Sequence, residues 1–128
     1  MMDTMVQSLL EQAIDTPCKL HLLLIFHENT RMEATAQQLA QRSCRDIWSV
    51  TQALKELVED GVLADTSSSG EPRYSYMPRP EQLEPICRLV RGYDDPLERD
   101  RIQSSVRELA SYAPFHRSNS WQRQHAMR

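Results

Sequence analysis

Glycine is scarce in this chain of 128 residues, which holds only Gly61, Gly70 and Gly92. Three isolated glycines cannot form the glycine-rich loop that cradles phosphates in nucleotide-binding enzymes. The sequence also suggests no Ser-His-Asp or Cys-His arrangement of catalytic residues, and the chain is small for a catalytic cleft of its own. We therefore expect no enzymatic activity, no catalytic residues and no cofactor.

Cysteine is also infrequent, and Cys18, Cys44 and Cys87 are far apart in sequence. An odd number of unpaired cysteines argues against a disulfide framework and indicates reduced thiols in a cytosol. No CxxC or HxxxH spacing is present, so we expect no metal site. A redox or metal switch built from Cys18, His21 and another cysteine is the alternative to three simply buried thiols.

Long apolar runs are missing as well, since the longest, Leu22 to Phe26, falls far short of the ~20 residues that cross a bilayer. The N-terminal stretch carries Asp3 and no Lys or Arg, which is not the pattern of a secretory signal. The chain is 40% hydrophobic and 26% charged, with a net charge of −3. These values are ordinary for a soluble globular protein, and we expect one cytoplasmic domain without membrane contact.

Two consecutive helices are predicted in the middle of the chain. Thr35 and Gln38 have the spacing of a capping box, which predicts a helix over 35–42. Asp46 is placed to cap a second helix over 46–60. One face of this second helix is apolar, through residues three or four apart: Ile47, Val50, Leu54 and Leu57.

A β-hairpin is predicted directly after these helices. Gly61 can take a positive φ and so end the preceding helix. Two short strands within 62–78 then flank a polar loop over 66–73, which contains serine, glycine and proline.

Further helices are predicted on both sides, near 3–14, 17–28, 81–91 and 96–112. The apolar face of the first could pack on its own domain or on a second copy, and we favour the second. The end of the chain has neither periodicity nor acidic residues, and we expect it to be a disordered basic tail. The chain is thus divided into four segments: 1–16, 17–80, 81–113 and 114–128.

The middle of the chain resembles the winged helix-turn-helix domain of MarR-like and ArsR-like bacterial transcriptional regulators. Their usual order is met without a gap by Leu39-Ala40, Asp46, Val50, Leu54, Leu57, Gly61 and Val62-Leu63. The turn departs from that pattern, because Ser43, Cys44 and Arg45 stand where an apolar residue, glycine and an apolar residue are usual. The resemblance covers 19–80 and implies an α+β, mostly α fold. It further implies a small β-hairpin wing, a short strand at 32–34, and extra helices at both ends of the chain.

The resemblance also implies a function, binding of double-stranded DNA by a homodimeric transcriptional regulator that associates through its terminal helices. Helix 46–60 would lie in the major groove and the 66–73 wing beside it. Gln52 could bond adenine and Lys55 a phosphate, while Trp48 could stack or contact a thymine methyl. The full set of candidate DNA contacts is Arg42, Arg45, Trp48, Ser49, Thr51, Gln52, Lys55, Ser68 and Arg73.

The charge of this segment favours a second hypothesis. From Glu33 to Pro80 there are five basic and seven acidic residues, a net charge of −2, whereas DNA affinity comes largely from neutralising phosphates. Ile47 and Trp48, at the reading end, favour a winged-helix protein–protein interaction module that no longer binds DNA. Trp48 could alternatively pack under the N-terminal helix.

Overall fold

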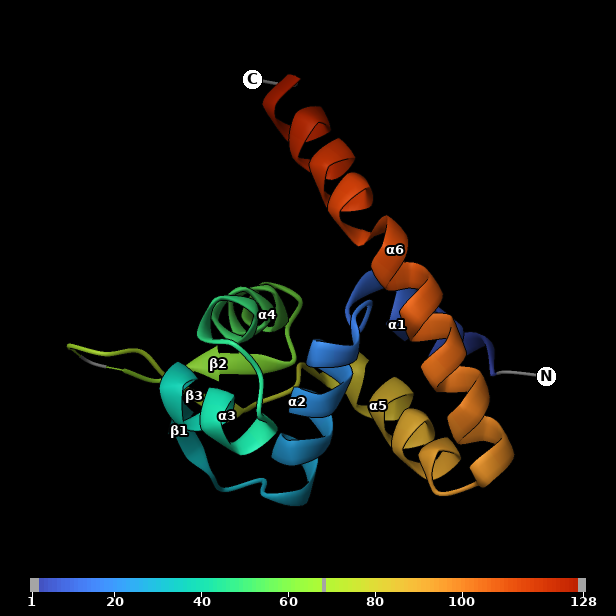
Figure 1. The fold of residues 1–128 in the computed structure, drawn as a ribbon, viewed down its shortest axis with the longest axis horizontal. Helices are drawn as coiled ribbons and strands as arrows, with labels where there is room; N and C mark the ends of the chain where they lie inside the picture. The colour runs from blue at the N-terminus through green and yellow to red at the C-terminus, as the bar shows by residue number, and fades with distance from the viewer. Residues whose placement is uncertain (1–2, 68, 127–128) are drawn as a thin grey trace.

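The structure, a computed structural model, describes residues 3–67 and 69–126, and of 112–126 it describes the backbone alone. Within these residues the chain is α+β and mostly α, as the sequence predicts (Figure 1). Its elements in order are α1 (Thr4–Gln12), α2 (Pro17–Glu28), β1 (Glu33–Thr35), α3 (Ala36–Ser43), α4 (Ile47–Glu59), β2 (Leu63–Asp65), β3 (Arg73–Tyr76), α5 (Pro80–Tyr93) and α6 (Pro96–Ala126).

The three strands form one antiparallel sheet in the order β1-β3-β2. Ala34 lies opposite Tyr74, and Ala64 lies opposite Ser75. The predicted hairpin is therefore present, and the predicted third strand lies one residue later than 32–34. Strand β3 also contacts α2, since His27 Nδ1 lies 3.2 Å from Tyr76 Oη. Burial raises the pKa of Tyr76 to about 12.

The predicted helix caps are confirmed atom by atom. The Gln38 backbone N–H donates to Thr35 Oγ1 at 3.2 Å, and the Thr35 N–H donates to Gln38 Oε1 at 2.9 Å, which completes the capping box at the start of α3. The Ser49 N–H donates to the Asp46 carboxylate at 2.8 Å at the start of α4. Gly61, with φ of 80°, follows α4.

The turn between α3 and α4 forms despite its unusual residues. Cys44 takes the left-handed conformation, with φ 56° and ψ 38°, where glycine would be unstrained. Ser43 is buried, and its hydroxyl donates a hydrogen bond to the Leu39 carbonyl at 2.7 Å. The Arg45 N–H donates to the Ala40 carbonyl at 3.1 Å. These bonds hold α4 in a fixed direction relative to α3.

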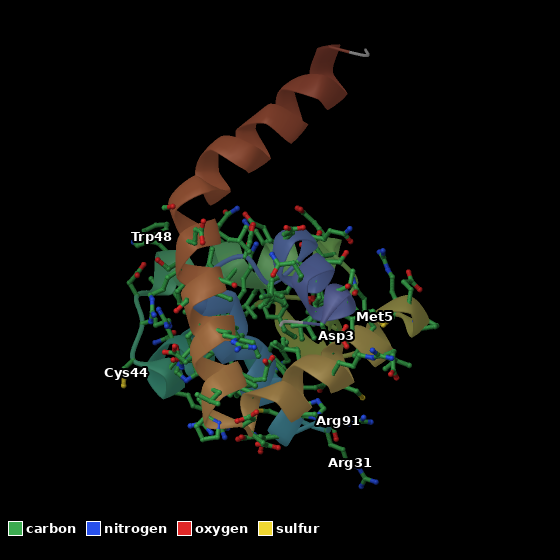
Figure 2. The ribbon with its side chains drawn as sticks, turned by 90° about the vertical axis from the view of Figure 1, so that its right-hand side faces the viewer. Asp3, Met5, Arg31, Cys44, Trp48 and Arg91 are labelled. Carbon is green, nitrogen blue, oxygen red and sulfur yellow. The ribbon has the colours of Figure 1, made fainter. Side chains whose placement is uncertain are left out.

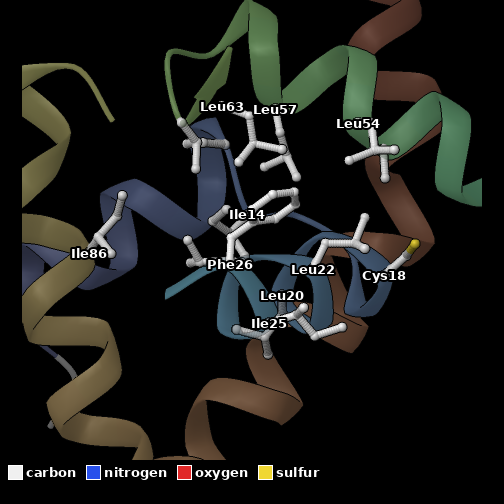
Figure 3. Packing of buried hydrophobic residues seen from close by; sticks show 14 of the residues in the cluster. Ile14, Cys18, Leu20, Leu22, Ile25, Phe26, Leu54, Leu57, Leu63 and Ile86 are labelled. Carbon is white, nitrogen blue, oxygen red and sulfur yellow. The ribbon is translucent and has the colours of Figure 1, made fainter. Parts of the chain in front are cut away.

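Helix α2 supplies the centre of the core. It is rich in leucine and buried on several sides, and Figure 3 shows its side chains meeting those of α4 and β2. Phe26, Leu54 and Leu57 are each fully buried. The inner face of α4 is thus packed against α2 in the core, and this packing determines which residues of α4 face outward.

Helix α1 packs on its own chain, so our preference for packing on a second copy is wrong for this face. Val6, Leu9 and Leu10 are buried where α1 meets α5 and α6. Asp3 accepts from Arg88 Nη1 at 2.7 Å, which ties the start of α1 to α5. The apolar residues of α6 are covered in the same way, since Ile102 and Val106 are each only 1% exposed. A homodimer stays a prediction, but these faces no longer support it.

Helix α6 continues to Ala126, so its predicted end at residue 112 and the predicted disorder over 114–126 are both corrected, while the last two residues of the predicted tail lie outside the described residues. Figure 1 shows its C-terminal half projecting away from the other elements. A helix is held by local backbone hydrogen bonds and needs no apolar face. The stretch 115–126 contains no glycine and several good helix formers, namely arginine, glutamine and alanine. Periodicity, which detects packed helices, could not reveal it.

Candidate nucleic-acid interface

The outer face of α4 presents one stripe of side chains to solvent. Trp48, Gln52 and Lys55 are exposed and recur three or four residues apart, on the side opposite the buried Val50, Leu54 and Leu57. Trp48 is 82% exposed, so the alternative that it packs under the N-terminal helix is wrong. Figure 2 places it on the other side of the molecule from Asp3 and Met5 of the N-terminal region.

Gln52 is held by a polar network that reaches into the core. Its Nε2 donates to Glu56, and Glu56 pairs with Lys19 of α2. Lys19 Nζ also donates to Asp15 Oδ1 at 2.7 Å, and the Lys19 side chain is only 2% exposed. Because the network occupies one N–H of Gln52, the second N–H and the amide oxygen remain for an outside partner.

Sequence reasoning missed this network. The i,i+4 spacing of Asp15 and Lys19 is a signal for such a pair, but nothing local indicates that Glu56 joins them from another helix. Glu56 is one of the seven acidic residues counted against DNA binding. It is ion-paired with Lys19, which lies outside the counted segment and is shared with Asp15.

Asp46 keeps a negative charge at the first turn of α4. The Ser49 backbone N–H and hydroxyl both bond to its carboxylate, which lowers the pKa of Asp46. The charge is favourable at a helix N-terminus, but it would oppose a nearby phosphate. Ser49 is exposed and Thr51 is half-buried.

The two arginines assigned to phosphates lie in different surroundings. Arg42 on α3 is exposed, with Nη1 3.5 Å from Met32 Sδ. Arg45 is half-buried and lines a cavity beside Leu20 of α2 and Val106 of α6. Its Nε is buried with no acceptor, which costs roughly 1–3 kcal/mol.

The loop between β2 and β3 extends away from the sheet (Figure 1). At its start, Asp65 Oδ1 accepts from the Ser67 N–H at 3.0 Å and from Ser67 Oγ at 2.7 Å, and these bonds lower the pKa of Asp65. Arg73, where the loop returns, is exposed. Ser68 lies outside the described residues, so its predicted role stays a prediction.

The cysteines lie in three separate environments. Cys18 is buried, Cys87 is half-buried and Cys44 is exposed, and burial raises the pKa of the Cys18 thiol. Across residues 3–67 and 69–126, no three His, Cys, Asp or Glu side chains that the structure describes are grouped as metal ligands. In the same part of the chain, every helix is too short or too polar to cross a membrane.

Comparison of the chain with protein-family models, with curated proteins and with solved structures finds no match.

Proposed function

We propose that this chain binds double-stranded DNA as a winged-helix transcriptional regulator, with α4 in the major groove and the β2–β3 loop as its wing. The observation that carries the proposal is the outer stripe of α4. It projects Trp48, Gln52 and Lys55 into solvent, while the opposite face is fixed in the core. A helix about 10–12 Å across fits a major groove about 12 Å wide.

The distribution of charge supports the proposal more than the net charge does. Lys55 on α4, Arg42 on α3 and Arg73 beside the wing are all exposed. Glu56, by contrast, is turned toward the buried Lys19. Exposed bases can neutralise phosphates, whereas an internally paired acid repels them little.

The test is fluorescence anisotropy with random duplexes and with duplexes selected from a random pool, at low and moderate salt. Lys55→Ala and Arg73→Ala should weaken binding to all sequences alike and flatten the dependence on salt, because each removes a phosphate contact. Gln52→Ala should cost about 1–3 kcal/mol on selected duplexes and little on random ones.

Arg91→Ala is the matched control, since Arg91 is an exposed arginine on α5 that Figure 2 places across the molecule from Trp48. It should leave both affinities unchanged. The absence of any wild-type binding, even at low salt, would refute the proposed function.

A protein–protein interaction module is the second candidate, and the exposure of Trp48 favours it. An indole that is 82% exposed beside Ile47, which is 40% exposed, is typical of an anchor for a partner. Under this alternative the wild type does not bind duplexes, and Trp48→Ala abolishes capture of a protein partner. Under the DNA proposal the same variant weakens binding to duplexes.

A homodimer accompanies the DNA proposal, because reading two half-sites requires a two-fold arrangement. Sedimentation of the wild type at micromolar concentration, with and without a selected duplex, tests it. A monomer under both conditions would count against two half-sites and leave single-site binding as the mode of recognition.

A further inference from the structure

A cavity of about 390 Å³ lies between α2, the α3–α4 turn and α6. This volume is within the range of small-molecule sites. Leu20, Leu24 and Val106 give it an apolar wall, and His21, Arg45 and Arg107 give it polar groups. Together with Tyr93 at the end of α5, these elements give the cavity both apolar and polar side chains.

The polar groups of this cavity favour a negative charge. Among the described residues no acidic side chain lines it, and neither arginine pairs with a carboxylate. Arg107 donates only a long bond to Ser104 Oγ, at 3.4 Å. The Arg45 Nε is buried without an acceptor. Arg45 thus brings a guanidinium N–H without an acceptor to this cavity, and Arg107 adds an exposed guanidinium to the lining. An anionic ligand could accept hydrogen bonds from both groups.

His21 adds hydrogen-bonding capacity without adding a third charge. Burial lowers its pKa, and the nearby positive charge of Arg45 lowers it further. The neutral ring carries one donor and one acceptor. At the other side of the cavity Gln103 Nε2 donates to Tyr93 Oη at 2.7 Å, which fixes two more lining side chains.

We propose that this cavity binds a small organic carboxylate with an apolar body. The carboxylate lies between the guanidinium groups of Arg45 and Arg107, and the body packs on Leu20, Leu24 and Val106. The apolar wall argues for an organic anion over inorganic phosphate, because phosphate would leave that wall unfilled. The site does not depend on DNA binding, although Arg45 directly precedes Asp46, the cap of α4.

The test is calorimetric titration of the full chain with 2-naphthoate and with its neutral analogue 2-naphthamide. 2-Naphthoate should bind, and 2-naphthamide should bind at least about tenfold more weakly, since it lacks the charge-assisted hydrogen bonds. Arg45→Gln and Arg107→Gln should each weaken 2-naphthoate about tenfold and leave 2-naphthamide unchanged.

Arg42→Gln and Arg101→Gln are the matched controls, because they remove exposed arginines of α3 and α6 that do not line the cavity. Should Arg45→Gln fail to fold by circular dichroism, Arg107→Gln decides alone, since Arg107 is exposed. The proposal is overturned by absence of 2-naphthoate binding at millimolar concentration. Equal affinity for the two probes, or equal losses in the controls, would overturn it as well.

Discussion

Lys19 of α2 is a buried charged residue that forms an ion pair with Glu56 of α4. Its ammonium group is almost fully buried between the carboxylates of Asp15 and Glu56. Burying a charge is costly unless it is paired and hydrogen-bonded. The surrounding carboxylates meet this condition, and they in turn need the lysine. The three groups therefore act as one unit. Removing one of them should lower the free energy of unfolding by more than the intact unit contributes to it.

Lys19→Met should destabilise the protein by about 3–5 kcal/mol, because it removes the cation that lies between the buried Asp15 carboxylate and the half-buried Glu56 carboxylate. Urea unfolding monitored by circular dichroism measures the loss. Lys55→Met, at an exposed lysine of α4, is the control and should change stability by less than about 0.5 kcal/mol. Similar small effects in both variants would mean that water reaches the three groups.

His21 predicts a pH dependence of stability in the acid direction. Its pKa is lowered in the folded state by burial and by Arg45, so the unfolded chain takes up the proton more readily. Stability therefore falls as the pH drops from about 7.5 to about 5.5, where the unfolded state binds more protons.

The measurement is urea unfolding of the wild type and of His21→Gln at both pH values. The variant should lose less stability than the wild type between them. An equal loss in both proteins would show that other groups account for the whole dependence.

At the scale of elements, the α3–α4 turn decides where the outer stripe of α4 points. Cys44 occupies the left-handed region with φ of 56°, a conformation that is strained for a residue with a side chain. Its side chain is exposed and makes only a long sulfur contact of 3.9 Å to the Gln41 carbonyl. The strain is therefore not offset by packing.

Cys44→Gly should stabilise the protein by about 0.5–1 kcal/mol, as relief of backbone strain outweighs the greater entropy of the unfolded glycine. Cys44→Val should destabilise it, because a β-branched residue tolerates this conformation poorly. The midpoints of urea unfolding compare the two. If the variants rank the other way, the turn does not hold Cys44 in this conformation.

At the scale of the whole molecule, α1 is part of the core. Leu10 of α1 and Ile14, two residues after its end, are fully buried and belong to the same cluster as Ile86 of α5 and Ile102 of α6. The N-terminal helix thus joins the two C-terminal helices into one layer beside α2. The helices that sequence reasoning assigned to a second copy instead complete this chain.

Leu10→Ala should therefore cost about 2–5 kcal/mol, the usual range for a fully buried leucine. Met5→Ala, on the same helix but 39% exposed, should cost little, within about 0.5 kcal/mol. Thermal or urea unfolding distinguishes them. A stability loss in Leu10→Ala that depends on protein concentration would instead indicate that α1 also contributes to a dimer.

The sequence by itself determined the features that depend on neighbouring residues. Thr35 and Asp46 cap their helices as predicted, and Gly61 takes its positive φ after α4. Caps and turns are satisfied within a few residues along the chain, so their side chains and spacing are enough to identify them. The exposed position of Lys55 follows in the same way from the helical period, whereas the sequence left the placement of Trp48 open.

Only the tertiary structure decided which distant groups meet. It joined Glu56 to Lys19, turned Arg45 toward the cavity at α6, and covered α1 with α5 and α6. An apolar stripe shows that a helix must be covered but not by what, because hydrophobic burial is non-directional. A charged side chain can likewise pair with any oppositely charged group that the fold brings near it. These long-range contacts depend on how all the helices pack together, so they cannot be predicted from any short stretch of the sequence.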